Sequence, residues 1–388
     1  MKLFDDTEVA FALKSDSQLE RAYYLFKMIQ NQPLVKIGSA VTNFALKAHL
    51  PIEGLIRSTV FDHFCGGVTE DDCLPIIENM HTNGNVHSVL DYSVEGKDEE
   101  ASFNEALQKI LKIIDFCAEK KSIPFAVFKP TGFGRFALYQ KVSEGKELTE
   151  KEEIEWIQVI KRFHKVAQVA LEKDVPLLID AEESWMQDAA DELIEDLMEM
   201  YNTKKAIVFN TLQMYRHDRM HYLQALHTKA KARGFHIGMK VVRGAYMEKE
   251  RKRAQEMGYR DPICKDKQET DENFNAAIKY MMDNSHMALF AGTHNEESSY
   301  LLMDLAKEYQ LRNNDRRLWF GQLFGMSDNI SYNLAKEGYN VAKYLPFGPV
   351  RDVMPYLIRR AEENTSVAGQ TSRELNLLQT ERERRKLK

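Results

Sequence analysis

Short apolar runs alternate with long amphipathic segments from residue 86 onward, and no other feature constrains the fold as strongly. A strand that is followed by a helix and another strand produces parallel strands joined by crossover helices. Eight such units within roughly 250–300 residues match the size of a (β/α)8 barrel, so we predict an α/β fold of the TIM-barrel type. The expected strands are 86–92, 123–129, 175–180, 205–210, 236–242, 287–292, 318–322 and 340–345.

The segments between these runs have helical periodicity. No GxGxxG fingerprint follows any run and no run is an obvious edge strand, which favours a closed barrel over the alternative of a doubly wound sheet. The expected helices are 97–121, 148–173, 184–201, 217–233, 246–283, 295–309, 326–337 and 349–363.

Three segments are expected along the chain. Residues 1–85 are predicted to form a helical N-terminal extension, because "SDSQLERAYYLFKMIQ" (15–30) begins with capping residues and spaces its apolar residues as a helix does. Residues 86–365 form the predicted barrel. Residues 366–388 alternate in charge and are expected to be a solvated helix, with a basic tail that binds a partner as the alternative.

Composition excludes several classes of protein. The net charge of −6 gives no strong field that would favour nucleic acid or anionic lipid, so we expect no nucleic-acid partner. Four cysteines occur without a CxxC pair, which indicates free thiols in a reducing compartment. The N-terminus, "MKLFDDTEVAFALKS", lacks the apolar core of a signal peptide, and no apolar run approaches membrane-spanning length. We therefore expect a cytoplasmic protein.

No group of histidines and cysteines has the spacing of metal ligands. His294 follows a predicted strand and is suited to acid–base chemistry, to phosphate binding or to capping a helix. The segment "HDRMH" places His217 and His221 four residues apart, but it lacks the glutamate of HExxH and fits a solvated helix face better. We expect no metal site.

Polar residues follow several of the predicted strands, where a barrel carries its active site. Lys129 follows one strand and Asp180, in "IDAEESW", follows the next. A lysine–aspartate pair across adjacent strands could orient a substrate while keeping both groups ionised. The alternative is a purely structural salt bridge.

The segment "MKVVRGAYMEKE" (239–250) is a strand that runs into a Gly-Ala turn and a helix. Gly244 permits close approach of the backbone, and Lys240 and Arg243 add positive charge near a helix N-terminus. These features suit a phosphate or an electron-rich ring. The alternative is an ordinary turn between a strand and a helix.

The stretch "PYLIRRAEEN" (355–364) places Tyr356, Arg359, Arg360 and Glu363 on one helical stripe. Paired arginines suit bidentate binding of a carboxylate or phosphate, because the planar guanidinium matches two oxygens. The alternative is a solvated face with pairs at i, i+4 spacing.

The same helix is expected to begin near Asp352. That residue is the predicted N-cap, which would place Pro355 in the first turn, where its missing N–H costs nothing. Val353, Leu357 and Ala361 form the other stripe, which we expect to pack on the barrel.

These segments together resemble the monofunctional proline dehydrogenase family. The resemblance rests on the order of "VLDYSVEG", "VFKPTGFGR", "LLIDAEE", "FNTLQMY", "KVVRGAYMEKER", "THNEE", "FGQLFGM" and "KYLPFGPVRDVMPYLIRRAEEN", which cover most of the chain beyond the N-terminal helices. It implies a distorted (β/α)8 barrel with non-covalent FAD at the carboxyl ends of the strands. It also implies the oxidation of L-proline to Δ1-pyrroline-5-carboxylate, the first step of proline catabolism.

The resemblance assigns roles to individual residues. It implies that Arg359 and Arg360 bind the substrate carboxylate. The other residues implied to line the substrate pocket are Lys129, Asp180, Tyr246, Leu323, Tyr344 and Tyr356. The residues implied to contact the flavin are Ala181, Asn210, Lys240, Arg243, Gly244, Ala245, Thr293, His294 and Glu363.

The resemblance also implies partners. Electrons would pass from FAD to a quinone, so we expect peripheral docking on the inner face of the membrane. At 388 residues the chain has no room for an aldehyde dehydrogenase domain, so a separate pyrroline-5-carboxylate dehydrogenase is expected.

Three positions qualify the resemblance. Many relatives have arginine in place of Lys240 and glutamine in place of Asn210, so these flavin contacts are the least specified. Tyr344 is large beside the substrate ring, which favours proline over hydroxyproline.

Two alternative functions stay open. The chain could be another FAD-dependent barrel oxidoreductase, or a non-enzymatic scaffold that uses the Arg359/Arg360 face.

Overall fold

The computed structural model describes residues 2–31, 53–92, 98–366 and 370–387, with residues 33, 35 and 38. The side chains of residues 55, 58, 359–366 and 370 lie outside this description.

The eight strands form a closed barrel in chain order, which confirms the predicted fold class. The strand pairs with a described register are parallel, as crossover helices require. Every strand overlaps the run that predicted it, and β4 is displaced furthest from its predicted position. The strands are β1 (His87–Tyr92), β2 (Phe125–Phe128), β3 (Leu177–Ile179), β4 (Val208–Gln213), β5 (Ile237–Val242), β6 (Met287–Gly292), β7 (Leu318–Leu323) and β8 (Val341–Phe347).

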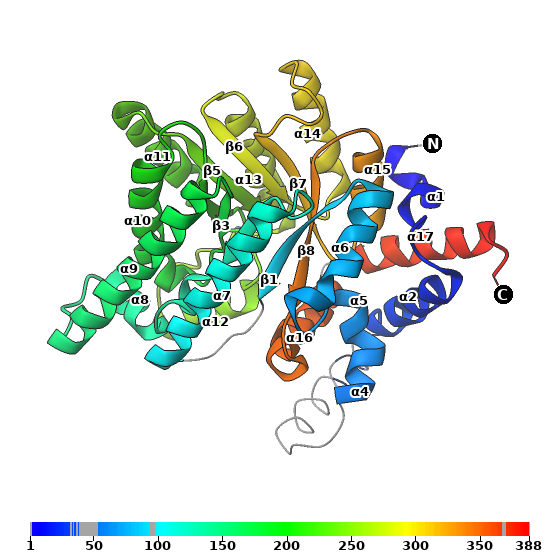
Figure 1. The fold of residues 1–388 in the computed structure, drawn as a ribbon, viewed down its shortest axis with the longest axis horizontal. Coiled ribbons are helices and arrows are strands. Elements are labelled where there is room, and N and C mark those ends of the chain that lie inside the picture. The colour runs from blue at the N-terminus through cyan, green and yellow to red at the C-terminus, as the bar shows by residue number, and fades with distance from the viewer. Residues whose placement is uncertain are drawn as a thin grey trace. The chain divides into compact units, whose positions relative to one another are not determined.

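Contacts divide the chain into two compact units. The central unit is residues 96–320, and the terminal unit joins residues 1–95 to 321–388. The helices of the central unit are α7 (Glu100–Glu119), α8 (Phe136–Ser143), α9 (Glu150–Glu172), α10 (Ser184–Tyr201), α11 (Arg219–Arg233), α12 (Met247–Met257), α13 (Lys267–Met282) and α14 (Glu296–Glu308), with a short 3-10 helix η3 (Pro130–Gly132). In Figure 1, α9, α10 and α11 lie together on one side of β3 and β5.

Two differences from prediction occur in the central unit. The segment 246–283 contains two helices rather than one, because Gly258 adopts a left-handed conformation (φ 72°) and closes α12. Helix α8 was not predicted, since its eight residues contain few apolar repeats.

Side chains of the central strands separate into an inner and an outer set. Phe125 on β2 contacts the rings of Phe209 on β4 and Phe290 on β6, with centroids 5.8 and 5.3 Å apart. The register pairs Phe209 with Gly238 and Thr211 with Lys240, so these four residues share that inner face. Gly238 is required there, because a Cβ atom would lie 2.7 Å from the Phe209 ring.

The terminal unit holds both ends of the chain. Its helices are α1 (Thr7–Ala10), α2 (Asp16–Ile29), α4 (Glu53–Ile56), α5 (Asp62–Phe64), α6 (Glu70–Gly84), α15 (Asp328–Lys336), α16 (Val350–Ser366) and α17 (Gln370–Arg384), with a 3-10 turn η1 (Leu3–Asp5) and a π-helical turn η2 (Arg57–Phe61). Figure 1 shows α17 beside α2, and the Arg382 guanidinium of α17 stacks 4.0 Å above the Tyr23 ring of α2. Helix α2 is the predicted N-terminal helix, and a capping box of Ser15 and Gln18 starts it.

Helix α17 corrects the prediction of a solvated tail. Leu377 and Leu378 are buried in a hydrophobic cluster that also contains Phe26 of α2 and Leu357 of α16. This apolar face could not be recognised in the sequence. Two adjacent leucines among charged residues are too few to show the hydrophobic periodicity of a helix.

Helix α16 begins before the predicted N-cap at Asp352. It starts at Val350, so Asp352 lies in the first turn instead of capping the helix, and Pro355 lies in the second turn. Val353 and Leu357 are buried as predicted, but they belong to the cluster with residues of α2 and α17. The prediction for Ala361 falls outside the described side chains. The position of this helix therefore depends on both ends of the chain.

Among the described residues, no helix is both long and apolar enough to cross a membrane.

Candidate functional site

Two lysines flank one aspartate on the inner face of the central unit. Lys240 Nζ donates a hydrogen bond to Asp180 Oδ1, and Lys129 Nζ lies 3.8 Å from Asp180 Oδ2. The predicted Lys129–Asp180 pair is therefore present, and Lys240 joins it from β5. The aspartate side chain is 15% exposed. Contacts from two lysines hold the orientation of the aspartate carboxylate fixed.

A second contact is made two residues further along both chain segments. Thr131 donates from its backbone N–H to Glu182 Oε2 at 2.9 Å and from its hydroxyl to Glu182 Oε1 at 2.7 Å. The Tyr139 hydroxyl donates to the Pro130 carbonyl at 2.8 Å, which fixes the other end of the same turn. Burial raises the pKa of Glu182 to about 7, while the bonds from Thr131 and the charge of Lys129 oppose that rise.

The loop after β5 is tied to the loop after β6. Arg243 donates to the Thr293 hydroxyl at 2.7 Å, to Asp271 Oδ1 at 2.7 Å and to the Ser298 hydroxyl at 3.0 Å. Burial lowers the pKa of Arg243, and the Asp271 carboxylate opposes this. The structure therefore brings together Arg243 and Thr293, two of the residues predicted to contact a flavin.

Gly244, next in the chain, can only be glycine. Its φ is +140°, and a Cβ atom would lie 2.5 Å from the Tyr215 ring. This packing fixes the turn that carries Ala245 and Tyr246, and Tyr246 precedes the first residue of α12.

Helix α12 is also fixed to the start of α10. Glu250 is fully buried, and its two carboxylate oxygens accept from the backbone N–H and the hydroxyl of Ser184, each at 2.6 Å. A carboxylate at a helix N-terminus satisfies N–H groups that have no partner within the helix. Ala181, another predicted flavin contact, lies in the loop between Asp180 and this helix.

The Asn210 side chain points away from the barrel interior, and its predicted contact with a flavin stays a prediction. Its amide donates to Asp191 Oδ1 of α10 at 2.9 Å and to the Tyr222 hydroxyl of α11 at 3.1 Å. The strand extends to Gln213 instead of ending at residue 210, so Asn210 lies within it on the outer face.

Gln213 is the residue that the sequence analysis missed on this strand. It shares the inner face with Thr211 and it is 3% exposed. Strict alternation along β4 would have selected it once the end of the strand was known.

The remaining predicted residues lie in the terminal unit. Tyr344 on β8 is buried, and it alternates with Lys343, which contacts α15; Tyr344 therefore lies on the face turned away from that helix. Leu323 ends β7 and packs against the hydrophobic cluster, of which Tyr356 on α16 is a buried member. The side chains of Arg359, Arg360 and Glu363 lie outside the described residues, so their roles stay predictions.

The described residues contain no group of three or more metal-ligating side chains. His294 follows β6 beside Thr293. All four cysteines are free, as predicted, and the structure buries them.

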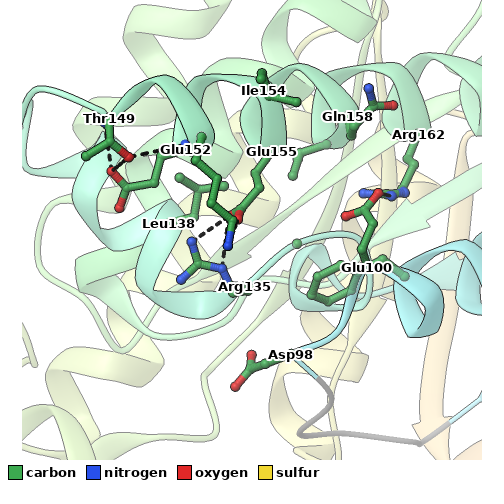
Figure 2. Close-up of a pocket in the computed structure, with 14 residues that line it drawn as sticks. Asp98, Glu100, Arg135, Leu138, Thr149, Glu152, Ile154, Glu155, Gln158 and Arg162 are labelled. Carbon is green, nitrogen blue, oxygen red and sulfur yellow. Dashed lines mark hydrogen bonds and ion pairs between the residues drawn. The ribbon is translucent and has the colours of Figure 1, made fainter.

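A cavity of about 860 Å³ opens elsewhere in the central unit, between α7, α8 and α9 (Figure 2). Arg135 donates to Glu155, and Arg162 pairs with Glu100, so these charges already have protein partners. None of the predicted site residues lines this cavity.

Comparison with known proteins gives a family match over most of the chain. Residues 73–373 match the family model described as Proline dehydrogenase. The carbapenem antibiotics biosynthesis protein CarD of Pectobacterium carotovorum subsp. carotovorum is 36% identical over 334 residues, which cover 86% of this chain and 86% of that protein. Proline dehydrogenase 1, mitochondrial, of Homo sapiens is 37% identical over 241 residues, which cover 61% of this chain and 40% of that protein.

Solved structures share the fold. Proline utilization A (PutA) from Bdellovibrio bacteriovorus, inactivated by N-propargylglycine, aligns with a TM-score of 0.71 and 19% identity over 95% of this chain and 40% of its own. A PutA structure with proline bound in remote sites aligns with a TM-score of 0.66 and 21% identity, and the alignment covers 32% of that longer chain.

Proposed function

This chain belongs to the proline dehydrogenase family and is an oxidoreductase that acts on proline. From this premise we propose that it binds FAD non-covalently and oxidises L-proline to Δ1-pyrroline-5-carboxylate. The observation that carries the proposal is the inner-face cluster of Lys129, Asp180 and Lys240 at the carboxyl ends of β2, β3 and β5, where a barrel holds its substrate.

The residues around that cluster fit a flavin. Gln213 lies on the same inner face and is 3% exposed, and a buried amide needs hydrogen-bond partners to compensate for its lost hydration. Lys240 and Arg243 add positive charge, and Gly244 and Ala245 offer little side-chain bulk. The proposed flavin contacts are Gln213, Ala181, Lys240, Arg243, Gly244, Ala245, Thr293, His294 and Glu363.

A bound FAD would supply the acceptor for the hydride that leaves the ring carbon beside the proline nitrogen. This chain's own residues would orient the substrate. Arg359 and Arg360 are proposed to bind the proline carboxylate in a bidentate manner, and Lys129 and Asp180 are also proposed to contact the substrate. Fixing the carboxylate fixes the ring, and orientation of this kind can lower a barrier by several kcal/mol. A closed, dry pocket would also favour the uncharged amine whose lone pair drives the oxidation.

The electron acceptor and the next enzyme are further parts of the proposal. A membrane quinone is the proposed acceptor, reached by peripheral docking from the cytoplasmic side. A separate pyrroline-5-carboxylate dehydrogenase would consume the product. Turnover of proline in detergent-free buffer, measured first with a dye acceptor and then with quinone-containing vesicles, tests the proposed acceptor. The vesicles should increase turnover.

The central test is anaerobic addition of proline to purified holoenzyme. The protein should be yellow, denaturation should release the flavin, and proline should bleach its visible absorbance. Arg359→Met and Arg360→Met should each raise KM for proline at least about tenfold with flavin retained, because each removes a charge-assisted bond. Colourless protein that takes up no FAD would favour the scaffold alternative, and wild-type kinetics in both variants would remove the arginines from the site.

Tyr344 gives a test of specificity. Its bulk on the inward side of β8 favours proline over ring-hydroxylated analogues. Tyr344→Ser should raise kcat/KM for hydroxyproline relative to proline. An unchanged ratio would mean that the tyrosine does not contact the ring.

A further inference from the structure

Two successive cross-strand contacts connect the ends of β2 and β3. Lys129 faces Asp180, and two residues further along each strand end Thr131 faces Glu182. The first contact lies on the inner face, where the substrate is proposed to bind. In the second contact the glutamate is buried, since Glu182 is only 6% exposed.

The two contacts differ in how tightly they are made. The Lys129–Asp180 ion pair, at 3.8 Å, is near the limit of a direct contact, so a small shift of the β2 end would break it. The Thr131–Glu182 contact consists of two hydrogen bonds, at 2.9 and 2.7 Å, and both carboxylate oxygens take part. The Thr131–Glu182 contact therefore sets the distance between Lys129 and Asp180.

Glu182 is held from both sides as well. Its backbone N–H donates to the Gln187 side chain at 2.8 Å, and the Gln187 amide donates in turn to Asp191. The turn that it holds is fixed at a second point, because the Tyr139 hydroxyl donates to the Pro130 carbonyl. Glu182 and the turn at Pro130–Gly132 are thus both held in place. If the contact between them is removed, the turn has little freedom to form another one.

We propose that Glu182, acting through Thr131, is a positioning residue that sets the distance between Lys129 and Asp180 and thereby the affinity for proline. This inference rests on the proposed site for proline. Glu182 touches neither substrate nor cofactor in this proposal, and its effect reaches the substrate through Lys129.

The charge state of Glu182 gives the proposal a distinctive readout. Lys129, Glu183 and Tyr139 are the titratable groups that act on it, and its pKa of about 7 places its ionisation within the working range of an assay. Ionised Glu182 accepts both bonds from Thr131 with charge assistance. Protonated Glu182 accepts one and donates one, so its hold on the turn is weaker below neutral pH.

Four variants separate the contributions. Glu182→Gln can accept from the Thr131 N–H and donate to the hydroxyl, so it keeps the shape and loses the charge. Glu182→Ala loses both bonds. Thr131→Val removes the hydroxyl bond alone, and Thr131→Ser restores it. Glu374→Gln is the matched control, because Glu374 is another buried glutamate whose pKa is raised to about 7, and it contacts Ser327 instead.

The experiment measures kcat and KM for proline on flavin-loaded protein between pH 6 and pH 8.5, with flavin content and thermal stability for each variant. Wild type and Glu374→Gln should show a KM that is several-fold lower above pH 7 than below it. Glu182→Gln should lose this step and keep the higher KM throughout. Glu182→Ala should raise KM about tenfold with a smaller change in kcat, Thr131→Val should do so in part, and Thr131→Ser should match wild type.

Two results would overturn the proposal: a KM for Thr131→Val and Glu182→Ala within twofold of wild type, or a pH step that persists in Glu182→Gln. Thr131→Val keeps the test valid if Glu182→Ala does not fold, because valine preserves the volume of threonine. Failure of wild type to turn over proline at all would instead refute the proposed function, so the two failures are distinguishable.

Discussion

Two clusters in this protein have the same composition and different positions. The central cluster is Lys129, Lys240, Asp180 and Glu182, and the terminal cluster is Lys14, Lys343, Asp328 and Glu374. In each cluster two lysines contact one aspartate, and burial raises the pKa of the glutamate to about 7.

The clusters differ in which side of the strands they occupy. In the terminal cluster Lys343 points from β8 to α15, where it lies 2.6 Å from Asp328 and donates to the Met326 carbonyl at 2.7 Å. Its side chain is 1% exposed, against 18% for Lys129 in the central cluster. The same charges therefore join a strand to a helix in one place and face the barrel interior at the strand ends in the other. Position relative to the sheet, and not residue type, separates a structural ion pair from a candidate site.

Breaking the terminal cluster should have the largest effect. Asp328→Asn leaves Lys343 buried without its carboxylate, and removing one partner of a buried pair typically costs about 3–5 kcal/mol. Urea unfolding followed by circular dichroism would measure the loss. Asp174→Asn, which removes an exposed pair with Lys205, is the control and should change the unfolding free energy by less than about 0.5 kcal/mol. Equal midpoints for the two variants would contradict the comparison.

The same change in the central cluster should affect activity more than stability. Asp180→Asn leaves Lys129 and Lys240 facing one another without a charge between them. We expect kcat/KM for proline to fall about 100-fold through loss of orientation, with a smaller loss of unfolding free energy than in Asp328→Asn. Steady-state turnover with a dye acceptor, normalised to bound flavin, measures it. If Asp180→Asn loses as much stability as Asp328→Asn and keeps its activity, the central cluster is a structural ion pair and not part of the site.

Glu374 should make stability depend on pH. The ordinary pKa of the carboxyl is 4.5, and burial raises it to about 7 in the folded protein, where Asp328 raises it further and Lys343 and Lys14 oppose the rise. Between these pH values the folded protein holds a proton that the unfolded chain has lost, so this group's contribution falls as pH rises from about 4.5 to about 7. Glu374→Gln should therefore gain about 1–3 kcal/mol relative to wild type between pH 5 and pH 8. Parallel stability curves for the two proteins across that range would refute this.

Substitution of Arg382 tests the contact between α17, which carries Glu374, and α2. It should have the smallest effect on stability. Its guanidinium stacks on Tyr23 and donates to Glu20 on α2. Arg382→Ala should lower the unfolding free energy by about 1 kcal/mol, since a stacked cation and a partly exposed ion pair each contribute less than that. Arg382→Lys should recover part of the loss, because it keeps the charge without the planar stack. Full recovery of the unfolding free energy in Arg382→Lys would show that the stacking contributes nothing.

The sequence predicted the barrel well, because its strands are continuous apolar runs separated by periodic helices. It placed β6 and α10 at their observed bounds, since Gly292 and Ser184 mark clear ends. It predicted β4 too early. Val208 to Gln213 includes polar inner-face residues, so only the apolar start of that strand could be recognised, and Asn210 was chosen in place of Gln213.

Sequence patterns could not predict the contacts between segments that are distant along the chain. The pairing of Lys129 with Asp180 was predictable because the two residues end adjacent strands. The bonds from Thr131 to Glu182 and from Ser184 to Glu250 depend on turn geometry that the sequence does not specify. The burial of α17 depends on helices more than 300 residues earlier in the chain, such as the one that carries Glu20.

The division into a contiguous central unit and a terminal unit built from both ends has a consequence for synthesis on the ribosome. Residues 96–320 emerge as one stretch and hold their own internal contacts, so they can begin to fold while translation continues. The N-terminal elements α2 and β1 must wait for β8, α16 and α17, which are made after the central unit. During that interval the apolar face of the N-terminal segment has no native partner, and it is the part of the nascent chain that most needs a chaperone.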